Sequence, residues 1–131
     1  MENRESEHSR AKVLAVPRVA SVVSLSKNGV TNENGEDLGK VEDIMVDLET
    51  GKISFVVIST GGMLGRDNRL FAVPWEAMKV SLHDKKFILN VTKETMSNAP
   101  SFNKNAWPDL SNLGWLREVY AYYGYQPYWK E

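Results

Sequence analysis

The feature that most constrains the fold of this chain is an unbroken apolar run, Phe55-Val56-Val57-Ile58, set among short segments of mixed polarity. A strand that faces water on one side alternates apolar and polar residues, whereas a continuous run indicates a strand covered on both faces. The neighbouring segments are rich in β-branched and aromatic residues, and clusters of Asn, Gly and Pro separate them. The sequence therefore predicts a mainly β fold with this run at its centre.

Five segments between residues 22 and 93 are expected to form strands, separated by turn-forming residues. The expected strands are 22–25, 38–48, 52–60, 69–73 and 87–92, with turns at Asn28-Gly29, 32–35, Thr50-Gly51 and Asp84-Lys85. Residues 75–82 form either a short turn of helix or an edge strand, and Trp75 is expected to plug one end of the structure. Since no helical crossover separates the strands, we expect an antiparallel sheet that is closed or nearly closed into a small barrel.

The last quarter of the chain has a different character. All five tyrosines, three of the four tryptophans and Phe102 lie after Asn98. Residues 109–123 are expected to form one helix, with Ser111 as its N-cap and Gly124 just beyond its end. This helix has two adjacent apolar stripes. The first consists of Leu113, Leu116, Tyr120 and Tyr123, and the second of Trp115, Val119 and Tyr122. A helix that is apolar over most of its circumference must be covered by another element.

The cover of this helix is either the chain's own sheet or a second protein. Residues 125–129 follow the helix as an extended aromatic arm. Tyr and Trp contribute strongly to protein interfaces because they combine a large contact area with a polar group. The alternative is that helix and arm complete the core of their own chain, and a homodimer would satisfy both interpretations. The predicted interface residues are Trp107, Trp115, Val119, Tyr122, Tyr123, Tyr128 and Trp129.

The N-terminal residues carry no sign of a targeting signal. Residues 1–12 are polar and lack apolar periodicity, which is typical of a flexible tail. The apolar run that follows is short and is interrupted by Pro17 and Arg18, so we expect neither a secretory signal nor a membrane span. The expected location is the cytoplasm. A formal net charge of −1 gives no global field that would concentrate the protein on nucleic acid or an anionic membrane.

The chain has no cysteine and two histidines, His8 and His83. The absence of cysteine excludes disulfides, thiol catalysis and zinc sites built on thiolates. His8 belongs to the expected tail, so a metal centre or a His-dependent triad would depend on His83, which we interpret as an exposed turn residue. The composition weighs against most classes of enzyme, and we expect no catalytic residue, no metal and no cofactor.

Several other patterns have both a structural and a functional interpretation. Gly61-Gly62-x-x-Gly65 indicates a corner of the barrel rather than a phosphate loop, because no Lys-Ser/Thr pair follows it. Asp47-x-Glu49-x-Gly51 indicates a hairpin turn rather than a calcium loop, since strands flank it. The acidic residues between positions 36 and 49 are interpreted as a solvated face rather than a proton relay. Basic side chains that could contact phosphate are Lys79, Lys85, Lys86 and Lys93, but the aromatics that RNA readers need lie elsewhere, so nucleic-acid binding is disfavoured.

A series of short motifs resembles the PRC-barrel family in order and spacing. The motifs are GEDLGKVED at 35–43, DLETGK at 47–52, GGMLG at 61–65, LFAVPW at 70–75 and APSF at 99–102, followed by WPD at 107–109 and YYGYQPYW at 122–129. The resemblance extends from Ala20 to Trp129 and is to a bacterial group with this aromatic tail.

The resemblance implies a small β-barrel similar to the cytoplasmic domain of the photosynthetic reaction centre H subunit and to the C-terminal domain of the ribosome maturation factor. In both, the barrel is a docking module without shared catalytic residues. We see neither the membrane helix of the first nor the partner domain of the second, so we expect neither of those roles to carry over. The resemblance therefore implies a non-enzymatic module that binds another protein; the alternative is a small-molecule or RNA-binding module linked to stress.

Three parts of the chain are expected. Residues 1–12 form the tail, residues 20–95 form the PRC-barrel domain, and residues 96–131 contain the helix and the aromatic arm, packed on the barrel or on a partner subunit. The expected partner is another protein, whose identity the sequence leaves open, and we also expect the chain to form a homo-oligomer.

Overall fold

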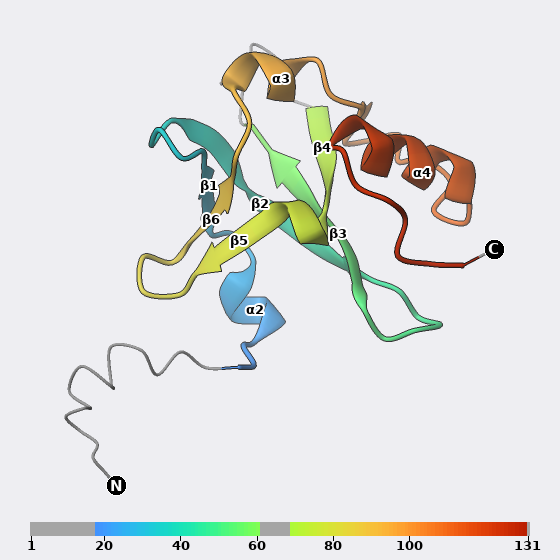
Figure 1. Cartoon of the computed structure of the whole chain (residues 1–131), viewed down its shortest axis with the longest axis horizontal. Coiled ribbons are helices and arrows are strands. Elements are labelled where there is room, and N and C mark those ends of the chain that lie inside the picture. Colours follow the sequence, from blue (N-terminus) through green and yellow to red (C-terminus); the bar gives the residue numbers. More distant parts are fainter. Residues whose placement is uncertain (1–17, 61–68, 131) are drawn as a thin grey trace, which may run out of the picture.

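The computed structural model describes residues 18–60 and 69–130, and in this part of the chain seven strands form one sheet (Figure 1). The strands are β1 Gly29–Thr31, β2 Asp37–Val46, β3 Ile53–Ser59, β4 Arg69–Pro74, β5 Met78–Ser81, β6 Lys86–Leu89 and β7 Ser101–Asn103. The helices are α2 Val22–Leu25, the 3-10 helix η1 Trp75–Ala77, α3 Lys93–Ser97 and α4 Leu113–Tyr122. The predicted mainly β fold is confirmed. The expected tail at 1–12 and the glycine connection at 61–65 lie outside the described residues.

The long central hairpin of β2 and β3 matches its prediction closely. The two strands pair in antiparallel register from Lys40 opposite Ser59 to Val46 opposite Ile53. Gly51 adopts a φ of 78° in the connecting turn, a left-handed conformation that costs glycine little. On the other edge of β3, β4 pairs antiparallel from Ser59–Leu70 to Phe55–Pro74. The expected strand at 69–73 is therefore confirmed.

The segment predicted as the first strand is instead the short helix α2. Ser21 caps its start, and the Ser21 hydroxyl accepts a hydrogen bond from the amide of Ser24. At its end, the Ser26 hydroxyl donates to the carbonyls of Val22 and Val23. The two valines favour a strand on propensity, but serine side chains at both ends satisfy the backbone of one helical turn. This prediction was wrong because capping outweighed propensity.

The first strand lies further along the chain, where a turn at Asn28-Gly29 was predicted. The turn is displaced towards the N-terminus, and Lys27 adopts the positive φ of 71°. β1 then pairs antiparallel with β2 and parallel with β6. The expectation of an antiparallel sheet is therefore confirmed for the other pairs but not for β1 and β6. The turn at 32–35 is confirmed, since the amide of Gly35 donates to the carbonyl of Asn32.

Residues 75–82 combine both predicted alternatives, the helical turn η1 followed by the edge strand β5. The order of the strands is β5-β6-β1-β2-β3-β4-β7, so the sheet is open, with β5 and β7 at its edges. Closure would require β5 to pair with β7, and each of these two strands pairs with one neighbour among the described strands, β5 with β6 and β7 with β4. The prediction of a closed barrel is not confirmed in the described part of the chain.

Two hydrophobic clusters lie on opposite faces of β3. Val56 and Ile58 point into the first cluster, which β6, η1 and α3 help to enclose, while Phe55 and Val57 point into the second. All four residues have an exposed fraction of 5% or less. The unbroken apolar run thus reflects a strand buried on both faces, as predicted.

Helix α4 covers the second cluster with Leu116, Val119 and Tyr120 (Figure 1). Its N-cap is Asn112, whose side-chain oxygen accepts from the amide of Trp115, so the helix begins one residue later than the predicted Ser111 cap places it. The side chain of Asp109 instead accepts hydrogen bonds from the amide and the hydroxyl of Ser111. Gly124 follows the helix with a φ of 83°, as predicted for the residue after the C-cap.

Candidate functional site

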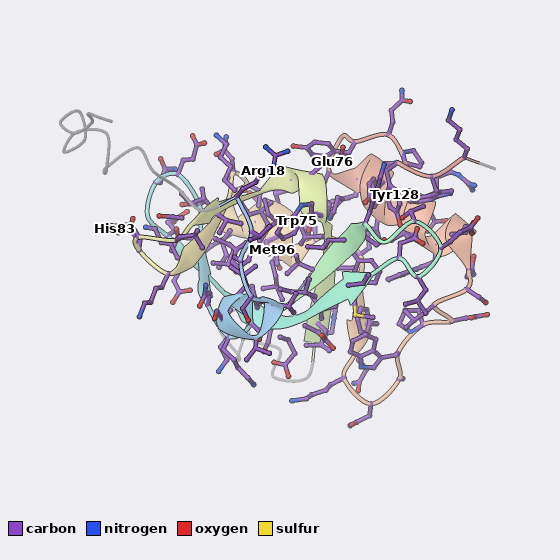
Figure 2. All side chains as sticks on the ribbon, turned by 90° about the horizontal axis from the view of Figure 1, so that it is seen from below. Arg18, Trp75, Glu76, His83, Met96 and Tyr128 are labelled. Carbon is purple, nitrogen blue, oxygen red and sulfur yellow. The ribbon has the colours of Figure 1, made fainter. Side chains whose placement is uncertain are left out.

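The aromatic arm folds back onto its own chain. The ring of Trp129 lies 5.3 Å from that of Tyr120 in an edge-to-face arrangement, and the ring of Tyr128 lies 6.0 Å from it. The Tyr128 hydroxyl donates a 2.5 Å hydrogen bond to Asp47 Oδ2 on the β2–β3 hairpin. In Figure 1 the red C-terminal segment runs beneath α4 towards this hairpin, and Figure 2 shows Tyr128 beside the hairpin. The arm therefore closes one side of the hairpin.

Tyr120 fixes α4 to the sheet. Its side chain is 1% exposed, and its hydroxyl donates a 2.6 Å hydrogen bond to the backbone carbonyl of Ser54 in β3. Burial raises the pKa of Tyr120 far above its usual value, so the hydroxyl keeps its proton. Tyr122 and Tyr123 connect the end of α4 to α3, through hydrogen bonds to the Thr95 carbonyl and to Met96 Sδ.

The seven predicted interface residues have different surroundings. Val119 is fully buried against the sheet of its own chain. Four others are partly buried beside the second cluster: Trp115, Tyr123, Tyr128 and Trp129. Trp107 and Tyr122 keep 36% and 38% of their surface exposed. Helix α4 thus uses residues of both predicted stripes to cover its own sheet.

A groove of about 860 Å³ lies between the β2–β3 hairpin, the residues before and at the start of α4, and the aromatic arm. We call it the apolar groove. Its apolar lining is Ile44, Met45, Val46, Leu48, Phe55, Leu110, Leu113, Leu116, Tyr128 and Trp129. Two of the predicted interface residues, Tyr128 and Trp129, therefore contribute to one of its walls.

Several apolar side chains of this groove face water. Leu48 at the hairpin tip is 96% exposed, Leu110 is 51% exposed and Leu113 is 43% exposed, and Val46 is also exposed. Single exposed leucines are ordinary, but a set gathered around one groove is typical of an interaction surface. None of these four residues is among the predicted interface residues. The available signal was an apolar residue at a hairpin tip, where turn residues are normally polar.

The rim of the groove is acidic. Asp43, Asp47 and Glu49 lie along the hairpin, and Lys130 is the basic residue among those that line the groove. The hydrogen bond from Tyr128, followed by those from the amides of Glu49 and Thr50, lowers the pKa of Asp47. Asp47 is therefore ionised at neutral pH. The site combines exposed apolar side chains with negative charge.

The candidate calcium loop is a hairpin turn in the structure. Asp47 Oδ1 accepts from the amides of Glu49 and Thr50, so the carboxylate serves the turn itself. His83 is exposed in the β5–β6 turn, and Figure 2 shows it at the outer end of the molecule. Within residues 18–60 and 69–130 there is no group of three or more side chains suited to hold a metal ion.

The helices of the described residues are too short and too polar to cross a membrane. No curated protein matches the chain in sequence. The sequence model of the PRC-barrel domain family matches residues 19–96, which is more than half of the chain. This match includes the strands β1 to β6, the motifs at 35–43 and 47–52, and the apolar run of β3. The chain belongs to the PRC-barrel domain family.

Proposed function

We propose that this protein is a non-enzymatic docking module that binds another protein in the apolar groove. The observation that carries the proposal is the exposure of Leu48, Leu110 and Leu113 around one groove. Burying a leucine side chain contributes about 1.5–3 kcal/mol, so a partner that covers two of them gains a substantial part of a micromolar affinity. The PRC-barrel family is generally non-catalytic, which agrees with a binding role.

The negative charge of the groove's rim favours a partner with a positively charged docking segment. Asp43, Asp47 and Glu49 favour a segment that combines apolar side chains with Lys or Arg. A second copy of this chain is a poorer occupant, because a two-fold interface places the same patch on both subunits and would bring two acidic rims together. The proposed partner is therefore a different protein, with an apolar and basic docking segment.

The test is selection of random displayed peptides on the purified full chain. We expect enriched peptides to contain apolar residues beside Lys or Arg, and to bind the variant Leu48→Ser/Leu110→Ser at least about tenfold more weakly. Val23→Ser/Val80→Ser is the matched control, since both valines are exposed outside the groove. Equal binding to all three proteins, or enrichment of acidic peptides, would overturn the proposal.

Homo-oligomer formation is a second candidate interaction, and the observation that favours it is the exposure of Trp107 and Tyr122. These two predicted interface residues remain available on the surface of the folded chain. Light scattering on the full chain and on Trp107→Ser/Tyr122→Ser measures it directly, and a monomeric wild type at high concentration would exclude it. We place both interactions in the cytoplasm, following the expectation from the sequence.

A further inference from the structure

A second hollow, of about 580 Å³, shares no lining residue with the apolar groove. Four lysines gather around it, and we call it the lysine pocket. Its lining is Lys27, Gly29, Val30, Thr31, Asp37, Gly39, Lys40, Ser59, Thr60, Asp84, Lys85 and Lys86. These residues come from β1, β2, the end of β3, the start of β6 and the two turns that precede β1 and β6.

The register of the sheet builds the pocket around Gly29. Lys86 and Lys40 are the partners of Gly29 on the two neighbouring strands, so the three residues form one row across β6, β1 and β2. Residues in one row point to the same face, and the α-carbons of the two lysines are about 10 Å apart. An added Cβ on Gly29 would meet nothing closer than 4.0 Å. The missing side chain of Gly29 therefore leaves open space between the positions of the two lysines.

The other two lysines lie in turns of unusual conformation. Lys27 has a φ of 71° and Lys85 a φ of 53°, and these are the non-glycine residues with positive φ in the described part of the chain. Residues other than Gly, Asn and Asp adopt this backbone conformation at a cost in free energy. Such residues concentrate at binding sites, where function maintains them against that cost.

The charge of the pocket is not balanced by its own residues. Four lysines face two acids, which leaves two net positive charges on a chain whose formal net charge is −1. No ion pair between described residues involves any of the four lysines. Asp37 accepts from the amide of Gly39 and Asp84 from the hydroxyl of Ser81. The lining of the lysine pocket is therefore positively charged.

Two hydroxyl groups of the lining also lack partners. The Oγ1 atoms of Thr31 and Thr60 are buried without a hydrogen bond to any described residue, and Thr60 is 1% exposed. Buried hydroxyls are normally paired, so such atoms call for a ligand that supplies the missing hydrogen bond. Both threonines belong to the lining of the pocket, and a hydroxyl group can donate to an oxygen atom of an anion.

We propose that the lysine pocket binds the diphosphate group of a small molecule. Lysine is a common phosphate ligand, and a diphosphate supplies both the charge and the several oxygen acceptors that four lysines and two hydroxyls can use. The volume lies in the range of small-molecule sites and exceeds what a bare diphosphate fills. RNA is disfavoured because the lining contains no aromatic ring on which a base could stack.

The first test follows NMR amide shifts of the isotope-labelled full chain during titration with pyrophosphate, ADP and single-stranded RNA. We expect saturable shifts for pyrophosphate and ADP, confined to the residues of the lysine pocket. Tighter binding of ADP would identify a nucleotide as the source, and equal binding would identify the diphosphate alone. The absence of saturable shifts, shifts located elsewhere, or RNA bound more tightly than both would overturn the proposal.

The second test separates the pocket from general charge. Lys40→Gln/Lys86→Gln should weaken pyrophosphate binding at least about tenfold, since it removes both ammonium groups beside Gly29. Lys79→Gln/Lys104→Gln removes the same charge outside the pocket and should change affinity less than about twofold. Equal losses in both double variants would overturn the site.

A third variant examines the buried hydroxyl. Thr60→Val keeps the shape of the side chain and removes its unpaired oxygen, so binding should weaken while the unfolding temperature of the free protein stays the same or rises. Unchanged affinity would exclude Thr60 as a ligand of the anion. Leu48→Ser/Leu110→Ser should bind pyrophosphate as the wild type does, which keeps this test independent of the apolar groove.

Discussion

The hydrogen bond from the Tyr128 hydroxyl to the Asp47 carboxylate makes the stability of the folded chain depend on pH. The Tyr128 hydroxyl, and then the amides of Glu49 and Thr50, lower the pKa of Asp47 below its usual value in the folded chain. A carboxylate with a lowered folded pKa stabilises the fold above its unfolded pKa, and this contribution is lost as the pH falls through the folded value. We therefore expect Asp47→Asn to be less stable than wild type near pH 7.

The difference between Asp47→Asn and wild type should shrink as the pH falls below about 4. Thermal unfolding of both proteins in a series of buffers measures it. The same series on Tyr128→Phe, alone and combined with Asp47→Asn, shows whether the two side chains act together. Parallel pH profiles for wild type and Asp47→Asn would contradict the prediction.

Trp75 illustrates how burial sets the cost of a substitution. Its ring packs edge to face on Phe87 with the centroids 6.2 Å apart, and it borders the first cluster while remaining partly exposed (Figure 2). Removing a fully buried tryptophan costs about 3–5 kcal/mol, so the partly exposed Trp75→Ala should cost about 2 kcal/mol. Denaturant unfolding measures the change, with the more exposed Trp107→Ala as a comparison. An unchanged midpoint for Trp75→Ala would show that the ring contributes nothing to the core.

At the scale of the elements, β2 approaches β3 closely where Gly39 lies. Gly39 has a φ of 131°, and an added Cβ would lie 2.4 Å from the carbonyl oxygen of Ser59. Because the obstacle is backbone in the centre of the sheet, Gly39→Ala should destabilise the protein by about 3 kcal/mol or more. Gly35→Ala is the matched control, with a φ of 82° and open space around its Cβ, and should cost about 1 kcal/mol. Similar losses measured by denaturant unfolding would contradict the steric argument.

At the scale of the whole molecule, the C-terminal segment covers one face of the sheet. Phe102, Leu116, Val119 and Tyr120 are buried in the second cluster, against residues of β3 and β4. A chain truncated after Ala99 would expose that face, and we expect it to aggregate. Light scattering on the full and truncated chains measures this. A truncated chain that stays dispersed and as stable as the full chain would refute the prediction.

The sequence predicted the central strands and the helix well because their evidence is local. Alternation and turn residues located the hairpin of β2 and β3, and the apolar run of β3 indicated burial on both faces. The first helix was missed because four residues carry too little periodicity to outweigh the propensity of two valines. The groove was predicted only through Tyr128 and Trp129, since its leucines come from the β2–β3 turn, the segment before α4 and α4 itself, which are distant in sequence.

What the sequence alone determined is the approximate position of strands β2, β3, β4 and β6, the burial of β3 on both faces, and the resemblance to the PRC-barrel family. The strand positions and the burial of β3 follow from patterns that repeat within a few residues, whereas the resemblance depends on the order and spacing of short motifs. The tertiary structure decided that the sheet is open, that the arm returns to Asp47, and that Lys40 and Lys86 flank Gly29. Such outcomes depend on which strand edges and side chains meet across the fold, and many pairings satisfy the same local pattern. Only the packing of the complete chain selects among them.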